Sequence, residues 1–344
     1  YIPGFGEDNQ ADYVAKLCAH IASKHGHACV AVDYHAYRAR PAQGCAINLE
    51  RDSLLKLELL CLRHGVPLVQ SDLMRTLHQV ADKLDEATSL RAVLEPTDGE
   101  YQNFGVLQAL DHLVVLNRLI ADGIPCDHNN VILIGSSHGG YIAHLVAKFA
   151  PNSINAVIDN SSYVRAPWSF LSVFPECHFG PPKLRIDCSV LSRWQFRAPS
   201  ESGYFGLAQQ LLRDVSCPLH LQEIKRQSVR LARHFCFNSV DDLYISPIEH
   251  KRFQQRQLQK IGAECQLTEI GAADLDGLLW KTTAHGMNAS MKTLCDRVLP
   301  AITARPTTLD GTRGTSLHFD GFDQIHRIDH LTQAPWMRAS VAAT

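Results

Sequence analysis

The sequence predicts an α/β fold built on a doubly wound, mostly parallel sheet. Short apolar segments that fit strands alternate with longer segments of helical periodicity, which is typical of such sheets. Residues 131–134 are all apolar, as expected for a strand that is buried on both faces of a parallel sheet. Ligands of these sheets bind outside the carboxyl ends of the strands. We therefore expect functional residues in the loops that follow the strands.

The expected elements follow one another in a regular order. The chain opens with "YIPGFG", which fits the end of a strand followed by a glycine turn. Further strands are expected at residues 27–34, 131–134, 154–160, 232–239 and 263–270. Helices are expected at residues 8–24, 101–121, 247–261 and 287–298, and in a segment that ends before Pro151. In that segment apolar residues recur at the spacing of one helix face: Ile142, Leu145, Val146 and Phe149.

Two stretches interrupt the alternation. Residues 51–98 contain two leucine-rich helical segments and are interpreted as a helical insertion. Residues 161–230 are rich in proline and aromatic residues and are interpreted as a cap or lid; a subdomain that packs without contacting substrate is the alternative. The core of the fold is expected over residues 1–160 and 231–300. The tail, residues 301–344, has no assigned role.

Composition excludes several classes of protein. The chain has 344 residues, of which 45% are hydrophobic and 20% charged, and its formal net charge is −2. Near-neutral charge gives no electrostatic basis for binding nucleic acid or an anionic membrane. No apolar run approaches 18 residues, so no membrane span is expected. The chain begins at Tyr1 inside a strand-like stretch, which leaves an upstream segment or a signal peptide open. The sequence predicts no oligomeric state.

Cysteines and histidines indicate neither disulfides nor a metal. The chain has 11 cysteines without a C-x-x-C pair, which favours free thiols in a reducing cytoplasm over a disulfide framework. The spacings nearest to a zinc motif are His25-x-His27 and His326-x-x-x-His330. In the second, Arg327 stands where H-E-x-x-H requires glutamate. Core or surface histidines are the favoured interpretation, and no metal or other cofactor is expected.

A glycine-flanked serine follows the strand at residues 131–134. Residues 135–139, "GSSHG", match G-x-S-x-G. In that motif the central serine occupies a sharp turn between a strand and a helix, and the glycines let the two approach closely. Neither a Walker A loop nor the dinucleotide motif G-x-G-x-x-G is present. No motif supports a cysteine nucleophile. The context favours Ser137 as a nucleophile over an ordinary tight turn.

A serine nucleophile requires a general base and a carboxylate that orients the base. In G-x-S-x-G proteins the acid and then the histidine follow the serine in the chain. Asp242 lies just past the strand at residues 232–239 and is the favoured acid. Asp241, one residue earlier, and Asp159, at the end of another strand, are the alternatives. His285, in a loop after the last strand, is the expected base; a structural role is its alternative.

The negative charge that develops during acyl transfer requires two backbone N–H donors. One is expected from His138, the residue after the nucleophile. The other is expected from Phe5 in "PGFG", where Gly4 and Gly6 let the backbone approach substrate. A plain glycine turn is the alternative for this stretch.

The segments "PGFG", "GSSHGG", "SVDD" and "AHG", in this order, resemble the α/β-hydrolase superfamily on its prolyl-oligopeptidase and esterase side. The stretches "EYQNFGVLQALDHL" and "TAHGMNAS" are similar to an uncharacterised bacterial hydrolase family often found among flagellin or surface-glycan modification genes. The resemblance covers roughly residues 1–300. It implies an α/β-hydrolase fold with Ser137 as nucleophile, Asp242 as acid and His285 as base.

These observations predict a serine hydrolase that cleaves a small carboxylic ester, with an O-acyl group on a sugar as one candidate substrate. Two alternatives stay open: a serine peptidase acting on short peptides, and a binding protein on an inactive hydrolase fold. The aromatic segment at residues 161–230 is expected to cover the mouth of the site. There it suits a sugar ring or an acyl chain better than an extended peptide.

Overall fold

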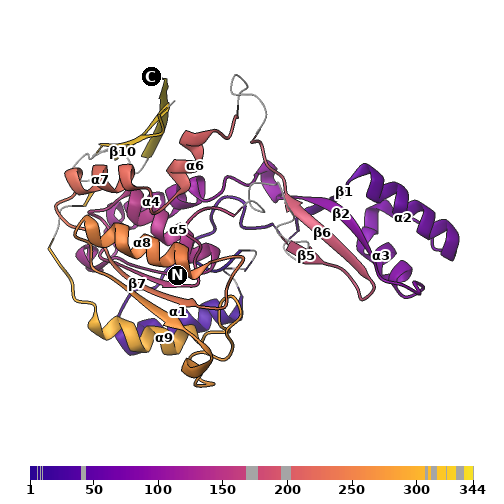
Figure 1. Cartoon of the computed structure of the whole chain (residues 1–344), viewed down its shortest axis with the longest axis horizontal. Helices are drawn as coiled ribbons and strands as arrows, with labels where there is room; N and C mark the ends of the chain where they lie inside the picture. The colour runs from indigo at the N-terminus through magenta and orange to yellow at the C-terminus, as the bar shows by residue number, and fades with distance from the viewer. Residues whose placement is uncertain are drawn as a thin grey trace. The chain divides into compact units, whose positions relative to one another are not determined.

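A computed structural model shows that the chain divides into two compact units (Figure 1). Unit 1 comprises residues 1–34, 104–166 and 195–344, and unit 2 comprises residues 35–103 and 167–194. The structure describes residues 1–5, 7, 9, 11–39, 44–167, 177–194, 203–306, 309–310, 316–322, 324–330 and 337–343.

The centre of unit 1 is a four-stranded parallel sheet with the strand order β3-β4-β7-β8. Its strands are β3 (Ile132–Ser136), β4 (Ala156–Asn160), β7 (Arg233–Ser239) and β8 (Cys265–Ile270). Ile2 extends the sheet at the β3 edge through a parallel bridge to Gly135. The predicted α/β class with a mostly parallel sheet is confirmed. Every strand ends at the same edge, where Ser137 and Asp242 follow two of them.

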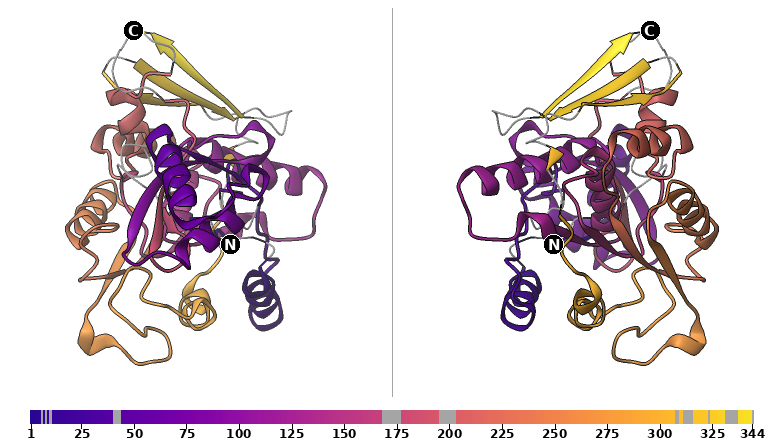
Figure 2. Two further views of the ribbon diagram at one scale, coloured as in Figure 1. Left: turned by 90° about the vertical axis from the view of Figure 1, so that its right-hand side faces the viewer. Right: turned by 90° about the vertical axis from the view of Figure 1, so that its left-hand side faces the viewer.

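Helices cover both faces of this sheet, as Figures 1 and 2 show. One face carries α1 (Asp12–His25) and α9 (Met291–Val298). The other carries α4 (Val106–Ala121), α5 (His138–Phe149) and α8 (Ile248–Lys260). On the first face, apolar residues of both helices pack on the inner strands in one buried cluster, which includes Val14, Leu17, Ile21, Leu294, Val298, Ile134, Ile158 and Phe237.

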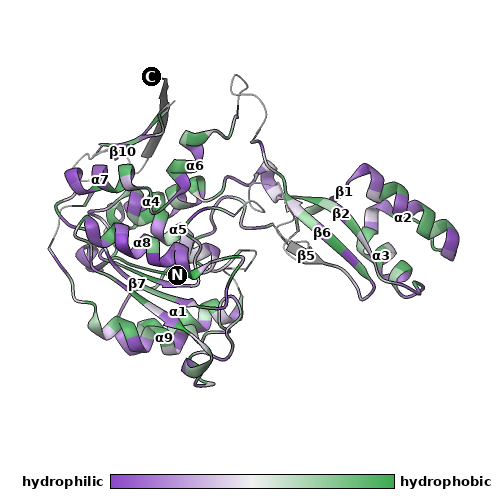
Figure 3. Cartoon of the chain, viewed as in Figure 1, coloured by the Kyte–Doolittle hydropathy of each residue, from purple (hydrophilic) through white to green (hydrophobic). Residues whose placement is uncertain are grey.

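Helix α5 is the most deeply buried helix of the described chain. All of its residues are buried, including the predicted apolar face of Ile142, Leu145, Val146 and Phe149, each at most 1% exposed. Helix α8 contrasts with it, because its sequence is mostly hydrophilic (Figure 3). It nevertheless buries Lys251 against the sheet. A buried ammonium group requires a charged partner, and Asp159 on β4 supplies it.

Unit 2 has its own four-stranded sheet, with the order β1-β2-β6-β5. Its elements are β1 (Ala46–Leu49), α2 (Arg51–His64), α3 (Leu73–Ala81), β2 (Thr88–Glu95), β5 (Cys177–Phe179) and β6 (Leu184–Val190). Strands β2 and β6 pair in parallel, whereas the other pairs are antiparallel. The stretch 51–98 was expected to be helical, but it also contains β2, because β2 pairs with a strand almost one hundred positions away.

The segment expected to form a lid, residues 161–230, contributes to both units. Its strands β5 and β6 belong to unit 2, and its helices α6 (Leu207–Arg213) and α7 (Pro218–Gln227) belong to unit 1. Several of its aromatic residues, among them Trp168 and Phe196, lie outside the described residues. Its role as a cap or lid stays a prediction.

The C-terminal strands form a separate antiparallel sheet (yellow in Figure 2) with the order β11-β10-β9. They are β9 (Ser316–Asp320), β10 (Gln324–His330) and β11 (Met337–Ala343), and β9 packs against α7. Short 3₁₀ turns occur at Gln70–Asp72, Thr97–Gly99, His128–Asn130, Ala272–Asp274 and Leu299–Ala301.

One expected strand is wrong. Residues 27–34 are all described and form no strand. The Tyr1 amino group donates to the Val30 carbonyl at 2.7 Å, and an Asn9 side chain donates to the Val32 carbonyl. These isolated hydrogen bonds do not form the repeated backbone pairing that defines a β-strand. In the described part of the chain, no helix combines the length and apolar character needed to cross a membrane.

Candidate active site

Ser137 occupies the turn between β3 and α5. Its backbone has φ 53° and ψ −118°, a conformation that residues other than glycine rarely adopt. Its N–H donates to the Asn160 carbonyl at 2.8 Å, and its carbonyl accepts from Tyr141 at 3.1 Å. Strain of this kind costs on the order of 1–3 kcal/mol and persists where surrounding structure enforces it, often at functional sites.

Two glycines of the motif are required by close packing. A Cβ on Gly139 would lie 2.0 Å from the Ile2 carbonyl oxygen, and one on Gly135 would lie 2.4 Å from the backbone of Gly139. The backbones of β3, the serine turn and Ile2 therefore lie so close together that no side chain fits at Gly135 or Gly139. The G-x-S-x-G pattern thus has the structural cause that the sequence predicted.

His285 reaches Ser137 from the loop between β8 and α9. Its Nε2 lies 2.7 Å from Ser137 Oγ. Two side chains from strand ends hold this loop: Asn160 Nδ2 donates to the Gly286 carbonyl at 3.1 Å, and Ser239 Oγ donates to the Thr283 carbonyl at 2.5 Å. These two hydrogen bonds fix the long loop after β8, so the His285 imidazole is held in one position.

Asp242 completes the series. Its Oδ2 lies 2.5 Å from His285 Nδ1, and its Oδ1 accepts the Ile245 N–H at 3.1 Å. Burial raises the pKa of this carboxyl, but the hydrogen bond and charge of His285 and the backbone N–H groups of Ser246 and Ile245 outweigh burial, so the net shift is downward. The group therefore stays ionised and can stabilise a protonated imidazole.

The two alternative acids lie elsewhere. Asp241 is exposed, and its N–H donates to Ser239 Oγ at 3.1 Å. Asp159 is fully buried on β4, where its Oδ2 lies 2.6 Å from Lys251 Nζ and 3.0 Å from His144 Nε2. Burial raises the pKa of Asp159, but the Lys251 charge and the two side chains' hydrogen bonds hold it well below its usual range. Of the three aspartates, Asp242 is the one hydrogen-bonded to His285.

The two expected oxyanion donors flank the serine turn. His138 is the first residue of α5, and the Phe5 ring meets the His138 ring edge-on, with centroids 5.7 Å apart. Phe5 lies in a turn closed by the Glu7 N–H, which donates to the Gly4 carbonyl at 3.1 Å. Gly6 lies outside the described residues. His138 follows Ser137 directly in the chain, and the Phe5 ring contacts the His138 ring. The role of the two backbone N–H groups as oxyanion donors stays a prediction.

The His138 side chain is part of the framework. It is fully buried, its Nε2 lies 2.9 Å from Gln108 Oε1, and its Nδ1 is hydrogen-bonded to the Tyr163 hydroxyl. Burial lowers its pKa to about 3, so the ring is neutral near pH 7. The sequence pattern did not indicate Gln108, Tyr163 or Asn160, because each acts through a partner at least 24 positions away.

A cavity of about 490 Å³ opens beside His285. Its lining is polar and apolar in about equal parts, and its polar side chains include Ser136, Asn160, Glu7, Tyr13, Lys16, Asn288 and Lys292. Glu7 Oε2 accepts from the Gly4 N–H and from the Tyr13 hydroxyl, both at 2.7 Å. The cavity has room for a small molecule with several hydrogen-bonding groups.

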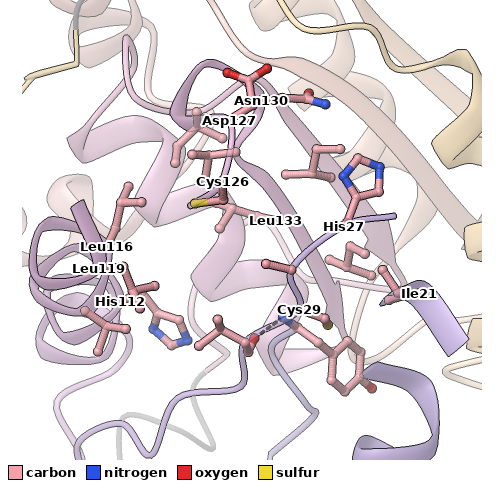
Figure 4. Close-up of a pocket in the computed structure, with 18 of the residues that line it drawn as sticks. Ile21, His27, Cys29, His112, Leu116, Leu119, Cys126, Asp127, Asn130 and Leu133 are labelled. Atoms are coloured by element: carbon pink, nitrogen blue, oxygen red, sulfur yellow. Dashed lines mark hydrogen bonds between the residues drawn. The ribbon is translucent and has the colours of Figure 1, made fainter. Parts of the chain in front are cut away.

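A second cavity, of about 460 Å³, lies along β3 (Figure 4). Its wall is largely apolar and includes Ile21, Leu116, Leu119 and Leu133. None of the three residues of the Ser–His–Asp series lines it. It is therefore separate from the candidate active site.

The parallel sheet, the serine turn after β3 and the hydrogen-bonded Ser–His–Asp series together define a protein of the α/β-hydrolase fold class. Residues 1–331 match the family described as "Protein of unknown function (DUF2920)", and the chain belongs to that family. None of the curated proteins matches it.

Solved structures with a similar fold include esterases and peptidases. The apo form of Thermogutta terrifontis esterase 2 is 12% identical with a TM-score of 0.35, and the match covers 60% of this chain and 69% of the esterase. Pyrococcus horikoshii acylaminoacyl peptidase is 14% identical with a TM-score of 0.37, over 60% of this chain and 30% of the peptidase. A Mycobacterium tuberculosis puromycin-hydrolyzing peptidase is 15% identical with a TM-score of 0.35, over 58% and 25%. This chain thus spans less than a third of either peptidase. Similarity at this level of identity and TM-score gives no information about the substrate.

Proposed function

We propose that the protein is a serine hydrolase that transfers the acyl group of a small carboxylic ester to water. The observation that carries the proposal is the continuous series from Ser137 Oγ to His285 Nε2 at 2.7 Å and from His285 Nδ1 to Asp242 Oδ2 at 2.5 Å. A nucleophile, a base and an orienting carboxylate at these distances are what acyl transfer through a serine requires.

In the proposed reaction, Ser137 Oγ attacks the ester carbonyl while His285 Nε2 takes its proton. The Asp242 carboxylate stabilises the imidazolium through Nδ1, and the N–H groups of His138 and Phe5 bind the oxyanion. Collapse of the tetrahedral intermediate releases the alcohol, which receives the proton from His285. Water then attacks the acyl-enzyme by the same steps and frees the acid and Ser137. The steps use no metal or organic cofactor.

The cavity beside His285 supports an ester of a hydroxylated alcohol, such as an O-acylated sugar. Its amide, hydroxyl and ammonium groups can donate to and accept from several hydroxyls at once. The link to flagellin or surface-glycan modification stays a prediction.

One observation favours a second candidate, a peptidase for short peptides. Glu7 places a carboxylate in the cavity wall, where it could pair with the amino terminus of a peptide. A charged anchor of this kind is what a terminus-directed peptidase requires.

The decisive experiment combines labelling with a substrate panel. A fluorophosphonate probe should label the wild type and not Ser137→Ala; equal labelling of both would contradict the assignment, because another residue would then be the reactive nucleophile. Absence of labelling in the wild type would favour a binding protein. In parallel, kcat/KM is measured for p-nitrophenyl acetate and butyrate, for O-acetylated sugars, and for aminoacyl and dipeptidyl nitroanilides. Esters should be turned over faster than nitroanilides. Faster nitroanilide cleavage that falls in Glu7→Gln would favour the peptidase.

A further inference from the structure

Two helices on the face of the sheet opposite α5 bring together three potential metal ligands. His20 and His25 lie near the end of α1, and Asp296 lies on α9. The Nε2 atoms of both histidines are 2.8 Å from the same oxygen, Asp296 Oδ1. The three ligand atoms lie within 4.8 Å of one another. The side chains are 24%, 9% and 26% exposed, in the same order, so the cluster is partly buried yet open to solvent.

We propose that His20, His25 and Asp296 form a binding site for Zn²⁺ or another divalent transition metal. Two imidazoles and one carboxylate are ligands that Zn²⁺ accepts, with a fourth position left for water. Bonds of about 2.0–2.2 Å at tetrahedral angles separate ligand atoms by about 3.4 Å, so each N···O distance must lengthen by about 0.6 Å. Partly exposed side chains can make that adjustment by small rotations.

A second cluster in the described chain shows why this one is the better candidate. His144, Asp159 and Cys236 also converge, and all three are buried. There, Lys251 Nζ lies 2.6 Å from Asp159 Oδ2 and its side chain is 1% exposed. A buried ammonium that cannot leave already supplies the positive charge and would repel a metal ion.

The lysine beside the proposed site is different. Lys24 Nζ lies 2.8 Å from Asp296 Oδ2, the oxygen that the histidines do not use, and its side chain is 55% exposed. Lys24 can therefore turn into solvent when a cation binds through Oδ1. It competes with the metal but does not block the site.

The site would join α1 to α9. Helix α1 follows the turn that contains Phe5, and α9 follows the loop that carries His285. A bound ion would therefore stabilise the native state by mass action and restrain the two segments that lead to the candidate active site. It takes no part in the proposed acyl transfer. The expectation of no metal rested on sequence spacing, which paired His25 with His27 and could not indicate Asp296.

The test measures Zn²⁺ binding to the metal-stripped protein by calorimetry, and Co²⁺ binding by visible absorption. The wild type should bind one equivalent more than either His20→Gln or Asp296→Asn, or bind it at least about tenfold more tightly. His250→Gln, which removes an exposed histidine on α8, should bind like the wild type. Lys24→Gln should bind about tenfold more tightly, because a nearby positive charge is gone.

Thermal unfolding provides a second readout that does not depend on counting sites. Zn²⁺ should raise the Tm of the wild type and of His250→Gln, and should raise it clearly less, or not at all, in His20→Gln. Circular dichroism of the metal-free variants checks that each is folded. Equal binding and equal Tm shifts in the wild type, His20→Gln and Asp296→Asn would overturn the proposal, as would the absence of saturable binding to the wild type.

Discussion

Replacing Asp242 by asparagine is the most informative perturbation of the proposed series. The side chain keeps its size, but one oxygen becomes an N–H₂ group. Oδ1 of Asp242 accepts the Ile245 N–H at 3.1 Å, and the carboxylate also accepts the Ser246 N–H. The Ile245 N–H will hold the remaining oxygen of the amide, so its N–H₂ group must face His285 Nδ1. The imidazole is then forced to carry its proton on Nε2, toward Ser137.

A histidine protonated on Nε2 cannot accept the serine proton. The variant should therefore lose the general base as well as the charge that stabilises the imidazolium. Loss of the correct tautomer in a Ser–His–Asp triad lowers kcat by about 10³–10⁴. That corresponds to about 4–5.5 kcal/mol of activation free energy.

Two neighbouring aspartates provide matched controls. Asp241→Asn changes an exposed carboxylate one residue away and should leave kcat/KM within about twofold. Asp159→Asn removes the partner of Lys251, whose side chain is 1% exposed. A buried charge left unpaired should cost about 3–5 kcal/mol of unfolding free energy. The three variants thus separate loss of chemistry from loss of stability.

The assay is hydrolysis of p-nitrophenyl butyrate, with the fluorophosphonate labelling rate and urea unfolding measured on the same preparations. Asp242→Asn should lose activity and labelling while it keeps an unfolding free energy close to that of the wild type. Near-wild-type kcat in Asp242→Asn would refute the reasoning. So would a loss of activity in Asp159→Asn at unchanged stability, because it would move the acid to β4.

Three further predictions follow from close packing, loop positioning and burial in unit 1. Gly139→Ala should unfold or fail to accumulate, because its Cβ would lie 2.0 Å from the Ile2 carbonyl oxygen; soluble yield and Tm measure this. Asn160→Ala should lower kcat about 10- to 100-fold, because the Gly286 carbonyl loses its 3.1 Å donor and the histidine loop is held less firmly. Burial lowers the pKa of His112 to about 4. Below about pH 6.5 the unfolded chain therefore binds a proton that the folded chain does not, and the free energy of unfolding should fall by about 1.6 kcal/mol as the pH drops from 6.5 to 5. His112→Gln should reduce that slope in urea unfolding.

Each of these has its own control and contrary outcome. Gly26→Ala, at φ 69° with open space around the new Cβ, should cost only about 1 kcal/mol; equal effects at both glycines would remove the argument from close packing. For Asn160→Ala, an unchanged kcat would show that the loop is positioned without the amide. For His112, an identical pH slope in the variant and the wild type would show that other groups control acid stability.

Much of unit 1 was predictable because its signals are local. The helix face of Ile142, Leu145 and Phe149 is buried as its spacing predicts. The apolar run at residues 131–134 forms the expected strand, although only Ile134 is buried and residues 131–133 are partly exposed. Unit 2 was not predictable in the same way. Strand β2 is stabilised by β6, and no pattern within residues 88–95 indicates that partner. The same limit explains residues 27–34, whose five consecutive apolar residues at 28–32 fit a strand but find no partner strand.

The choice of acid shows where sequence reasoning about the site ends. Asp159 follows the apolar part of β4, and Asp242 lies just past β7, so both belong to the edge of the sheet where Ser137 lies. Position alone therefore allowed either carboxylate. What separates them is a third element: α8 brings Lys251 to within 2.6 Å of Asp159, whereas Asp242 lies in the loop that His285 reaches. A carboxylate already neutralised by a buried ammonium has little charge left to stabilise an imidazolium. This supports Asp242 as the acid, and the paired variants above test that assignment by kcat on one side and by stability on the other.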